Sequence, residues 1–182
     1  MKEEEILEYV FKLSVVGSYA TGKTSLINQY VDRTFSKDYK PTLGASIIAK
    51  DLELEHKKME TLIRLVIWDI AGQEKYETVR SLYYQGCIAG IFVYDITRRP
   101  TFEEIQNKWI NDFKKYAQSK SLFILIGNKC DLEENRQVTQ EEGEELAKTI
   151  GAIDFIETSA KTGENVNSMF VHLVEAILNK VV

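Results

Sequence analysis

Residues 17–24 read G-S-Y-A-T-G-K-T and lie between an apolar strand-like run, residues 10–16, and a helix-compatible segment, residues 25–31. They match G-x-x-x-x-G-K-[ST], a loop whose glycines let successive backbone N–H groups point at phosphate oxygens. In such a loop Lys23 reaches the β- and γ-phosphates, the Thr24 hydroxyl ligates Mg²⁺, and the following helix directs its positive end at the same anion. A chance glycine loop is the alternative. The motif predicts a nucleoside triphosphate site formed by Gly17, Tyr19, Ala20, Thr21, Gly22, Lys23, Thr24 and Ser25.

Apolar strand-like runs recur along the chain at residues 11–16, 47–54, 62–68, 88–94, 122–126 and 153–156, with helical stretches at 101–117, 139–150 and 165–179. Alternating strands and helices predict parallel β-α-β units. Only about seven residues separate the second and third runs, which is too few for a crossover helix, so these two should form an antiparallel hairpin. We expect an α/β fold of the P-loop NTPase type: a six-stranded, mostly parallel sheet with one antiparallel edge strand and helices on both faces.

The whole chain, residues 1–182, is predicted to be a single domain, because no repeat, low-complexity tract or linker divides it. Residues 1–9 are expected to form a short acidic lead-in.

The chain carries 28 acidic and 23 basic residues, a balance that argues against a nucleic-acid-binding surface. Cys87 and Cys130 indicate reduced thiols in an intracellular protein, without metal-ligand spacing.

The sequence shows no membrane span and no signal peptide. It has no lipidation motif, because residue 2 is Lys and no cysteine ends the chain. We expect a cytoplasmic monomer. Membrane association stays open: it would be peripheral and would require a lipidated tail beyond Val182.

The third apolar run leads directly into D-I-A-G-Q at residues 69–73. An acid at the end of a buried strand is a Walker-B arrangement, in which we expect Asp69 to hold Mg²⁺ through water. Gly72 allows its backbone N–H to approach the γ-phosphate, and Gln73 is placed to orient an attacking water. Gln73 and Lys23 are the predicted catalytic residues. A strand-to-loop turn capped by the aspartate is the alternative.

Thr42 lies between the first helix and the second strand. Its side chain can ligate Mg²⁺ together with Thr24 and Asp69, and its N–H can contact the γ-phosphate. Both contacts vanish with the γ-phosphate, so this loop is a candidate order–disorder switch. A lone threonine would otherwise be an ordinary loop residue.

N-K-C-D at residues 128–131 follows the fifth apolar run and indicates which base is bound. The Asp131 carboxylate can accept two parallel hydrogen bonds from guanine N1–H and N2–H₂, a pair of donors that adenine lacks. Lys129 can lie on one face of the base, and Asn128 can tie this loop to the phosphate loop. The alternative is a plain Asn–Asp turn.

T-S-A-K at residues 158–161 ends the last apolar run and completes the predicted guanine pocket. The small residue Ala160 lets its N–H donate to guanine O6, and Lys161 can cover the base. Ser159 belongs to the same run.

These five motifs, in this order, resemble the Ras superfamily of small GTPases over residues 11–182. The resemblance implies slow GTP hydrolysis, with Mg²⁺ as cofactor and GTP or GDP bound. It implies that Phe35 lies edge-on to the guanine, that Tyr39 closes over the phosphates, and that residues 33–46 and 70–82 are two switches. Effectors that read the switches, an exchange factor and a GTPase-activating protein are the implied partners.

Within the superfamily the chain is most similar to the Rab branch, through residues 68–76, 83–86 and 93–97. Ala71 argues against the Arf-like branch, which carries a second glycine there. Two departures bear on vesicle trafficking. Ile47 stands where Rab chains have an aromatic residue, and the prenylatable cysteines that end Rab chains are missing.

Tyr19 stands at a phosphate-loop position where the superfamily usually has glycine or serine. Ala20 stands where it usually has glycine. One hypothesis is that Tyr19 slows hydrolysis and obstructs an incoming arginine, because the transition state requires tight positioning. The alternative is that the ring swings out to solvent or forms a lid over the nucleotide.

Three functions compete. The first is a GTP-hydrolysing switch, whose effectors would read an exposed cluster of Ile47, Trp68 and Tyr83 unless these residues are core. The second is a scaffold that holds GTP with little hydrolysis because of Tyr19, which the intact Gln73 argues against. The third is a kinase or motor ATPase, which the guanine-type N-K-C-D motif argues against.

Overall fold

A six-stranded sheet forms the centre of the computed structural model, which describes residues 7–38 and 40–181. Its strands occur in the order β2-β3-β1-β4-β5-β6, so β2 and β6 are the edges. Only β2 and β3 pair antiparallel, and the other neighbours pair parallel. The predicted fold class is confirmed. The strands are β1 (Leu7–Val16), β2 (Ala45–His56), β3 (Met59–Ile70), β4 (Ala89–Asp95), β5 (Leu122–Asn128) and β6 (Phe155–Thr158).

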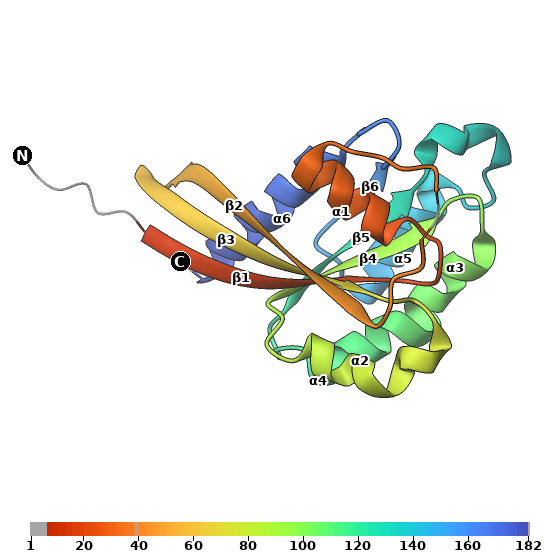
Figure 1. Ribbon diagram of the computed structural model, residues 1–182, viewed down its shortest axis with the longest axis horizontal. Helices are drawn as coiled ribbons and strands as arrows, with labels where there is room; N and C mark the ends of the chain where they lie inside the picture. Colours follow the sequence, from red (N-terminus) through yellow and green to blue (C-terminus); the bar gives the residue numbers. More distant parts are fainter. Residues whose placement is uncertain (1–6, 39, 182) are drawn as a thin grey trace, which may run out of the picture.

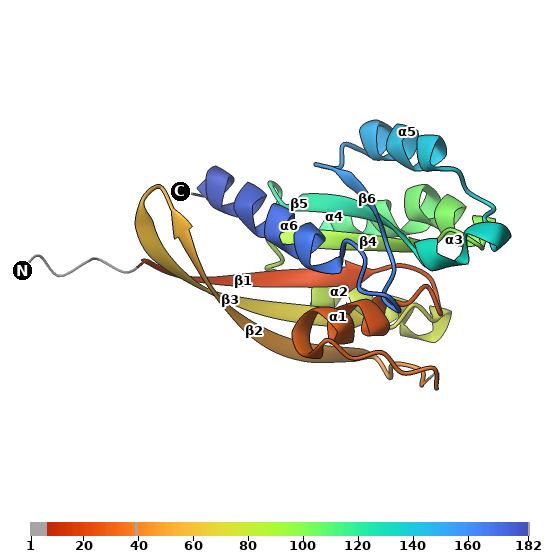
Figure 2. The same ribbon diagram turned by 90° about the horizontal axis from the view of Figure 1, so that it is seen from above.

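Helices cover both faces of this sheet. Figure 1 shows α1 and α6 on one side of the strands and α2 and α4 on the other, and Figure 2 shows the same layers from above. None of the helices in the described part of the chain has the length and apolar character needed to cross a membrane. The helices are α1 (Lys23–Asp32), α2 (Glu77–Tyr84), α3 (Arg99–Glu104), α4 (Ile110–Tyr116), α5 (Gln140–Ile150) and α6 (Val166–Val181).

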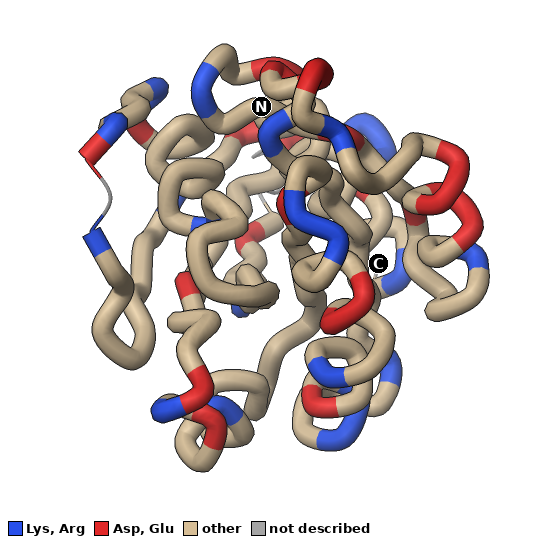
Figure 3. The backbone as a smooth tube through the Cα atoms, turned by 90° about the vertical axis from the view of Figure 1, so that its right-hand side faces the viewer, with Lys and Arg blue, Asp and Glu red and all other residues tan. Residues whose placement is uncertain are grey.

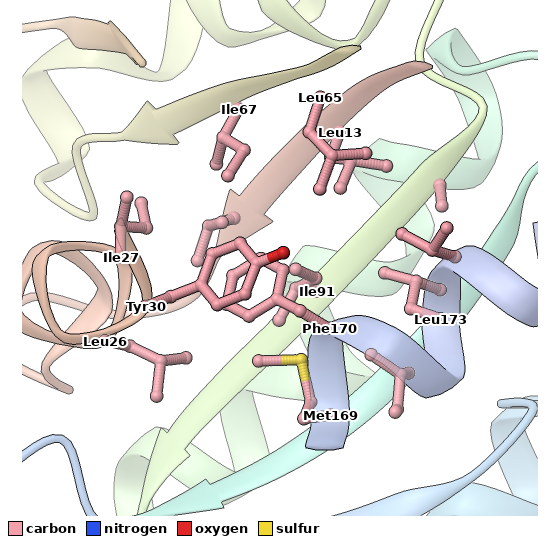
Figure 4. Close-up of a cluster of buried hydrophobic side chains, with 14 of the residues drawn as sticks. Leu13, Leu26, Ile27, Tyr30, Leu65, Ile67, Ile91, Met169, Phe170 and Leu173 are labelled. Atoms are coloured by element: carbon pink, nitrogen blue, oxygen red, sulfur yellow. The ribbon is translucent and has the colours of Figure 1, made fainter. Parts of the chain in front are cut away.

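The two faces of the sheet bury separate apolar clusters, which explains why β4 is buried along its whole length. On the α1–α6 face the rings of Tyr30 and Phe170 stack with their centroids 3.7 Å apart (Figure 4). On the opposite face Trp109 and Phe113 are fully buried. The loops that follow the strand ends therefore start from a sheet packed on both faces.

Two details differ from the predictions. Leu7 already pairs with Thr61, so β1 begins inside the supposed lead-in; that prediction is wrong for residues 7–9, and residues 1–6 lie outside the described part. The expected helix 101–117 is interrupted by a π-helical turn, η2 (Ile105–Trp109), between α3 and α4. A short 3₁₀ turn, η1 (Glu74–Tyr76), precedes α2, and another, η3 (Cys130–Asn135), follows β5.

Candidate nucleotide site

A cavity of about 670 Å³ lies where the parallel strands end, the size of a small-molecule site. Figure 3 views this end of the molecule, over which basic and acidic residues are interspersed. The structure brings most of the predicted site residues together around the cavity. Those that line it are Tyr19, Ala20, Gly22, Lys23, Thr24, Ser25, Phe35, Thr42, Gly72, Gln73, Asn128, Lys129, Asp131, Ala160 and Lys161.

Four other predicted residues stand behind this lining and support it. Gly17 packs so closely on β4 that an added Cβ would lie 2.1 Å from the Val93 carbonyl oxygen. The Thr21 hydroxyl donates to the Ser18 carbonyl at 3.0 Å. Asp69 and Ser159 are fully buried beside cavity residues. Tyr39, the remaining predicted residue, lies outside the described residues.

Lys23 is buried at the start of α1 and is held by the phosphate loop itself. Its ammonium donates to the carbonyl oxygens of Gly17 and Ser18 at 2.9 and 2.8 Å. Burial lowers the pKa of Lys23 to about 8, against the opposing attraction of the Asp69 carboxylate. A cation removed from water and paired with carbonyl oxygens would gain from the arrival of an anion.

Thr24, Thr42 and Asp69 converge from α1, the following loop and the end of β3. The hydroxyl oxygens of Thr24 and Thr42 are 2.9 Å apart, and both lie within hydrogen-bond reach of Asp69 Oδ2. Asp69 Oδ1 is buried and has no hydrogen-bond partner among the described residues. Burial raises the pKa of this carboxyl. Two hydroxyls and one carboxylate form a set of hard oxygen donors, which fits Mg²⁺.

Asn128 connects three segments of the site from the end of β5. Its side-chain amide donates to the Thr21 carbonyl at 2.9 Å. Its side-chain oxygen accepts from the Thr158 hydroxyl and the Ala160 N–H at 3.1 and 3.2 Å. Gly22 leaves room for this amide, because an added Cβ would lie 2.3 Å from it. Asn128 therefore links the phosphate loop to the T-S-A-K loop.

Lys129 and Asp131 follow Asn128 in the sequence and line the cavity with it. The Lys129 ammonium donates to the Ala20 carbonyl at 3.0 Å and lies 2.6 Å from Asp95 Oδ2. Asp131 accepts from the Ser159 hydroxyl at 2.7 Å, and its other oxygen lies 3.5 Å from the Lys161 ammonium. These contacts fix the Asp131 carboxylate at the cavity wall.

The phosphate loop adopts a backbone that its sequence does not favour. Ala20 has φ 58°, in the left-handed region that glycine adopts without strain. Gly72 lies directly against the loop, because an added Cβ would be 2.5 Å from the Tyr19 nitrogen. The Tyr19 carbonyl accepts from Arg98 at 3.1 Å, and Tyr19 is 45% exposed at the cavity.

Several cavity residues were not predicted: Asn28, Ser36, Lys37, Asp38, Lys40, Ala71 and Leu132. The positions of some of these residues in the sequence could have indicated that they line the cavity. Asn28 lies one helical turn after Thr24 and so shares its face of α1. Ser36, Lys37, Asp38 and Lys40 fall inside the expected first switch. Leu132 carries no such signal beyond following Asp131.

The suspected apolar cluster is partly exposed. Ile47 is 56% exposed and pairs with Trp68 across the β2–β3 ladder. The rings of Trp68 and Tyr83 lie 5.7 Å apart, and both are half-buried. The three side chains therefore present some apolar surface next to α2.

A phosphate loop between the first strand and the first helix of a mostly parallel sheet defines a P-loop nucleotide-binding protein of the α/β class. A sequence model of the Ras family matches residues 12–179. Rab-1 of Theileria parva is 40% identical over 174 residues, which are 96% of this chain and 77% of the relative. Rab-2B of Dictyostelium discoideum is 42% identical over 173 residues, 95% of this chain and 83% of the relative. Human Rab-3B is 39% identical over 177 residues, 97% and 78% of the two chains.

The chain belongs to the Ras family of small GTPases, and it is Rab-like. It is a GTP-binding, GTP-hydrolysing molecular switch, as the sequence motifs predicted. Neither the match to the Ras family nor the similarity to these Rab proteins favours a scaffold that holds GTP without hydrolysing it.

Proposed function

We propose that residues 1–182 form one G domain that binds GTP together with Mg²⁺ and hydrolyses it slowly. The convergence of Thr24, Thr42 and Asp69 beside Lys23 carries this proposal. The two threonine hydroxyls would ligate the ion and Asp69 would hold it through water. Bound Mg²⁺ neutralises charge on the phosphates. Lys23 would exchange its loop carbonyls for the β- and γ-phosphates.

Gln73 is proposed to orient the attacking water, and the Gly72 N–H to contact the γ-phosphate. Gln73 lines the cavity immediately before η1, at the start of the second switch, residues 70–82. Thr42 belongs to the first switch, residues 33–46. Because both loops would depend on the γ-phosphate, hydrolysis would release them and change the surface that effectors read.

The base would lie between Lys129 and Lys161, with Asp131 accepting from guanine N1–H and N2–H₂ and Ala160 donating to O6. Phe35, which is 40% exposed at the cavity, would meet the base edge-on. Tyr39 would close over the phosphates.

Effectors would bind the partly exposed surface of Ile47, Trp68 and Tyr83, and an exchange factor and a GTPase-activating protein would set the timing of the switch. We propose a cytoplasmic monomer that acts in vesicle trafficking, with no role for nucleic acid. The similarity to Rab proteins supports this assignment.

Single-turnover hydrolysis tests the proposal. The purified protein is loaded with GTP, Mg²⁺ is added, and GDP formation is followed in parallel with a sample held in excess EDTA. With Mg²⁺ we expect conversion over minutes to hours, and with EDTA we expect dissociation of the nucleotide and loss of turnover, because the phosphates then lack their counter-charge. Equal turnover in both samples would contradict a role for the ion.

Tyr19→Gly is expected to accelerate single-turnover hydrolysis by roughly tenfold, because removing the ring frees the space in which water and Gln73 must be positioned. Tyr19→Phe is the matched control. It keeps the ring and should leave the rate unchanged if the obstruction is steric. An unchanged rate in Tyr19→Gly would instead favour a ring that lies away from the reacting atoms.

A further inference from the structure

Two polar contacts of Ser18 join the phosphate loop to α3 and η2. The Ser18 hydroxyl donates to the Glu104 carboxylate and accepts from the Trp109 indole N–H at 3.1 Å. Ser18 is 5% exposed, and Trp109 is completely buried. The phosphate loop is therefore fixed to α3 and η2 through one side chain.

A buried arginine on α2, in the second switch, packs against the ring of Trp109. The Arg80 guanidinium carbon lies 4.4 Å from the centre of the Trp109 ring, and the side chain is 1% exposed. Within the described chain, none of its three nitrogens has a hydrogen-bond partner. It forms an ion pair at 3.7 Å with Glu77, whose carboxylate is largely exposed to solvent. Burying a guanidinium with so little compensation costs free energy, so stability alone does not explain Arg80.

Trp109, which meets both partners, is the last residue of the π-helical turn η2. Such a turn widens one turn of helix and is frequent at functional sites. Here it ends at Trp109, whose indole N–H reaches Ser18 while the ring packs on Arg80.

We propose that Arg80 is a positioning residue for GTP hydrolysis: stacked on Trp109, it fixes η1 and α2 against Ser18 of the phosphate loop and so holds Gln73 at the cavity. The inference rests on the proposed role of Gln73. Arg80 follows Gln73 by seven residues in the same switch segment. Releasing the ring contact would let that segment move relative to the loop and would misplace the water that Gln73 orients.

The test compares single-turnover hydrolysis in the GTP-loaded wild type, Arg80→Met, Arg80→Lys and the control Arg64→Met. Arg64 is an exposed arginine paired with Asp51, away from the cavity. We expect Arg80→Met to hydrolyse GTP roughly tenfold more slowly. Its GDP dissociation rate should be unchanged, and its melting temperature unchanged or higher, because an apolar side chain replaces a buried charge that is only weakly paired. Arg80→Lys should recover part of the rate, since an ammonium also binds an indole face. Arg64→Met should match the wild type.

Trp109→Phe provides an independent arm, because it keeps an aromatic ring but loses the donor to Ser18. It should also slow hydrolysis, and the double variant with Arg80→Met should be no slower than the slower single variant, since each breaks the same chain of contacts from Arg80 through Trp109 to Ser18. A wild-type rate in Arg80→Met overturns the inference. So does a double variant whose losses multiply. If Arg80→Met does not fold, a wild-type rate in Trp109→Phe overturns it.

Gln73→Ala separates this inference from the proposed function. If Gln73→Ala hydrolyses GTP as fast as the wild type, the proposed role of Gln73 fails and the inference falls with it. If Gln73→Ala is slow and Arg80→Met is fast, only the inference about Arg80 fails.

Discussion

Lys23→Met is expected to lower the affinity for GTP by roughly 100-fold to 10,000-fold. The ammonium would make two charge-assisted hydrogen bonds to the phosphates, each worth about 1.5–3 kcal/mol, and about 1.4 kcal/mol corresponds to a factor of ten. In the structure this cation is already desolvated and directed at the loop, so little reorganisation opposes the exchange of carbonyls for phosphates.

Fluorescent GTP titration measures the effect. Lys114→Met is the matched control, because Lys114 also donates to a main-chain carbonyl, that of Ile150, but lies on α4 away from the cavity. If the Lys23 and Lys114 variants bound GTP equally well, the phosphate site would have to lie elsewhere.

Asp131→Ala is expected to remove most of the preference for GTP over ATP. A site that hydrogen-bonds a specific donor pair rejects an analogue lacking it by roughly 10,000-fold, because its buried polar groups are otherwise left without partners. Without the carboxylate the GTP affinity should fall steeply while the already weak ATP affinity changes little. Ser159 and Lys161 would also lose the acceptor that they contact.

Competition of unlabelled GTP and ATP against a fluorescent guanine nucleotide measures this preference. Asp154→Ala is the control, since Asp154 faces His172 on a different part of the surface. A ratio of GTP to ATP affinity that survives in Asp131→Ala would refute the assigned guanine contact.

The sheet could be predicted because its signals are local. The apolar run that became β4 is buried on both faces, and the short polar gap that became the β2–β3 turn excludes a crossover helix. The start of β1 at Leu7 could not be predicted, because it depends on a partner strand more than fifty residues away. Helix α2 was expected only as part of a switch, since Arg80 at a buried position breaks its apolar pattern.

The cavity was predictable for a related reason. Its residues follow strand ends, and parallel strands that end at one edge bring Lys23, Asp69 and Asn128 together. The network around Trp109 follows no such rule. Ser18 meets residues 86 and 91 positions further along the chain, and we expected residues 101–117 to form one uninterrupted helix without the π-helical turn η2.

The two edges of the sheet bear on how the protein behaves at high concentration. An edge strand leaves backbone donors and acceptors open to a strand from another copy, which is a route to aggregation. At one edge β6 is only four residues long, too short to offer much of a template. At the other, β2 runs for twelve residues but carries Lys50, Asp51, Glu53 and Glu55. The short length of β6 and the charged side chains of β2 therefore both disfavour pairing with a strand from another copy. The long β2–β3 hairpin can lie in solvent without adding further strands.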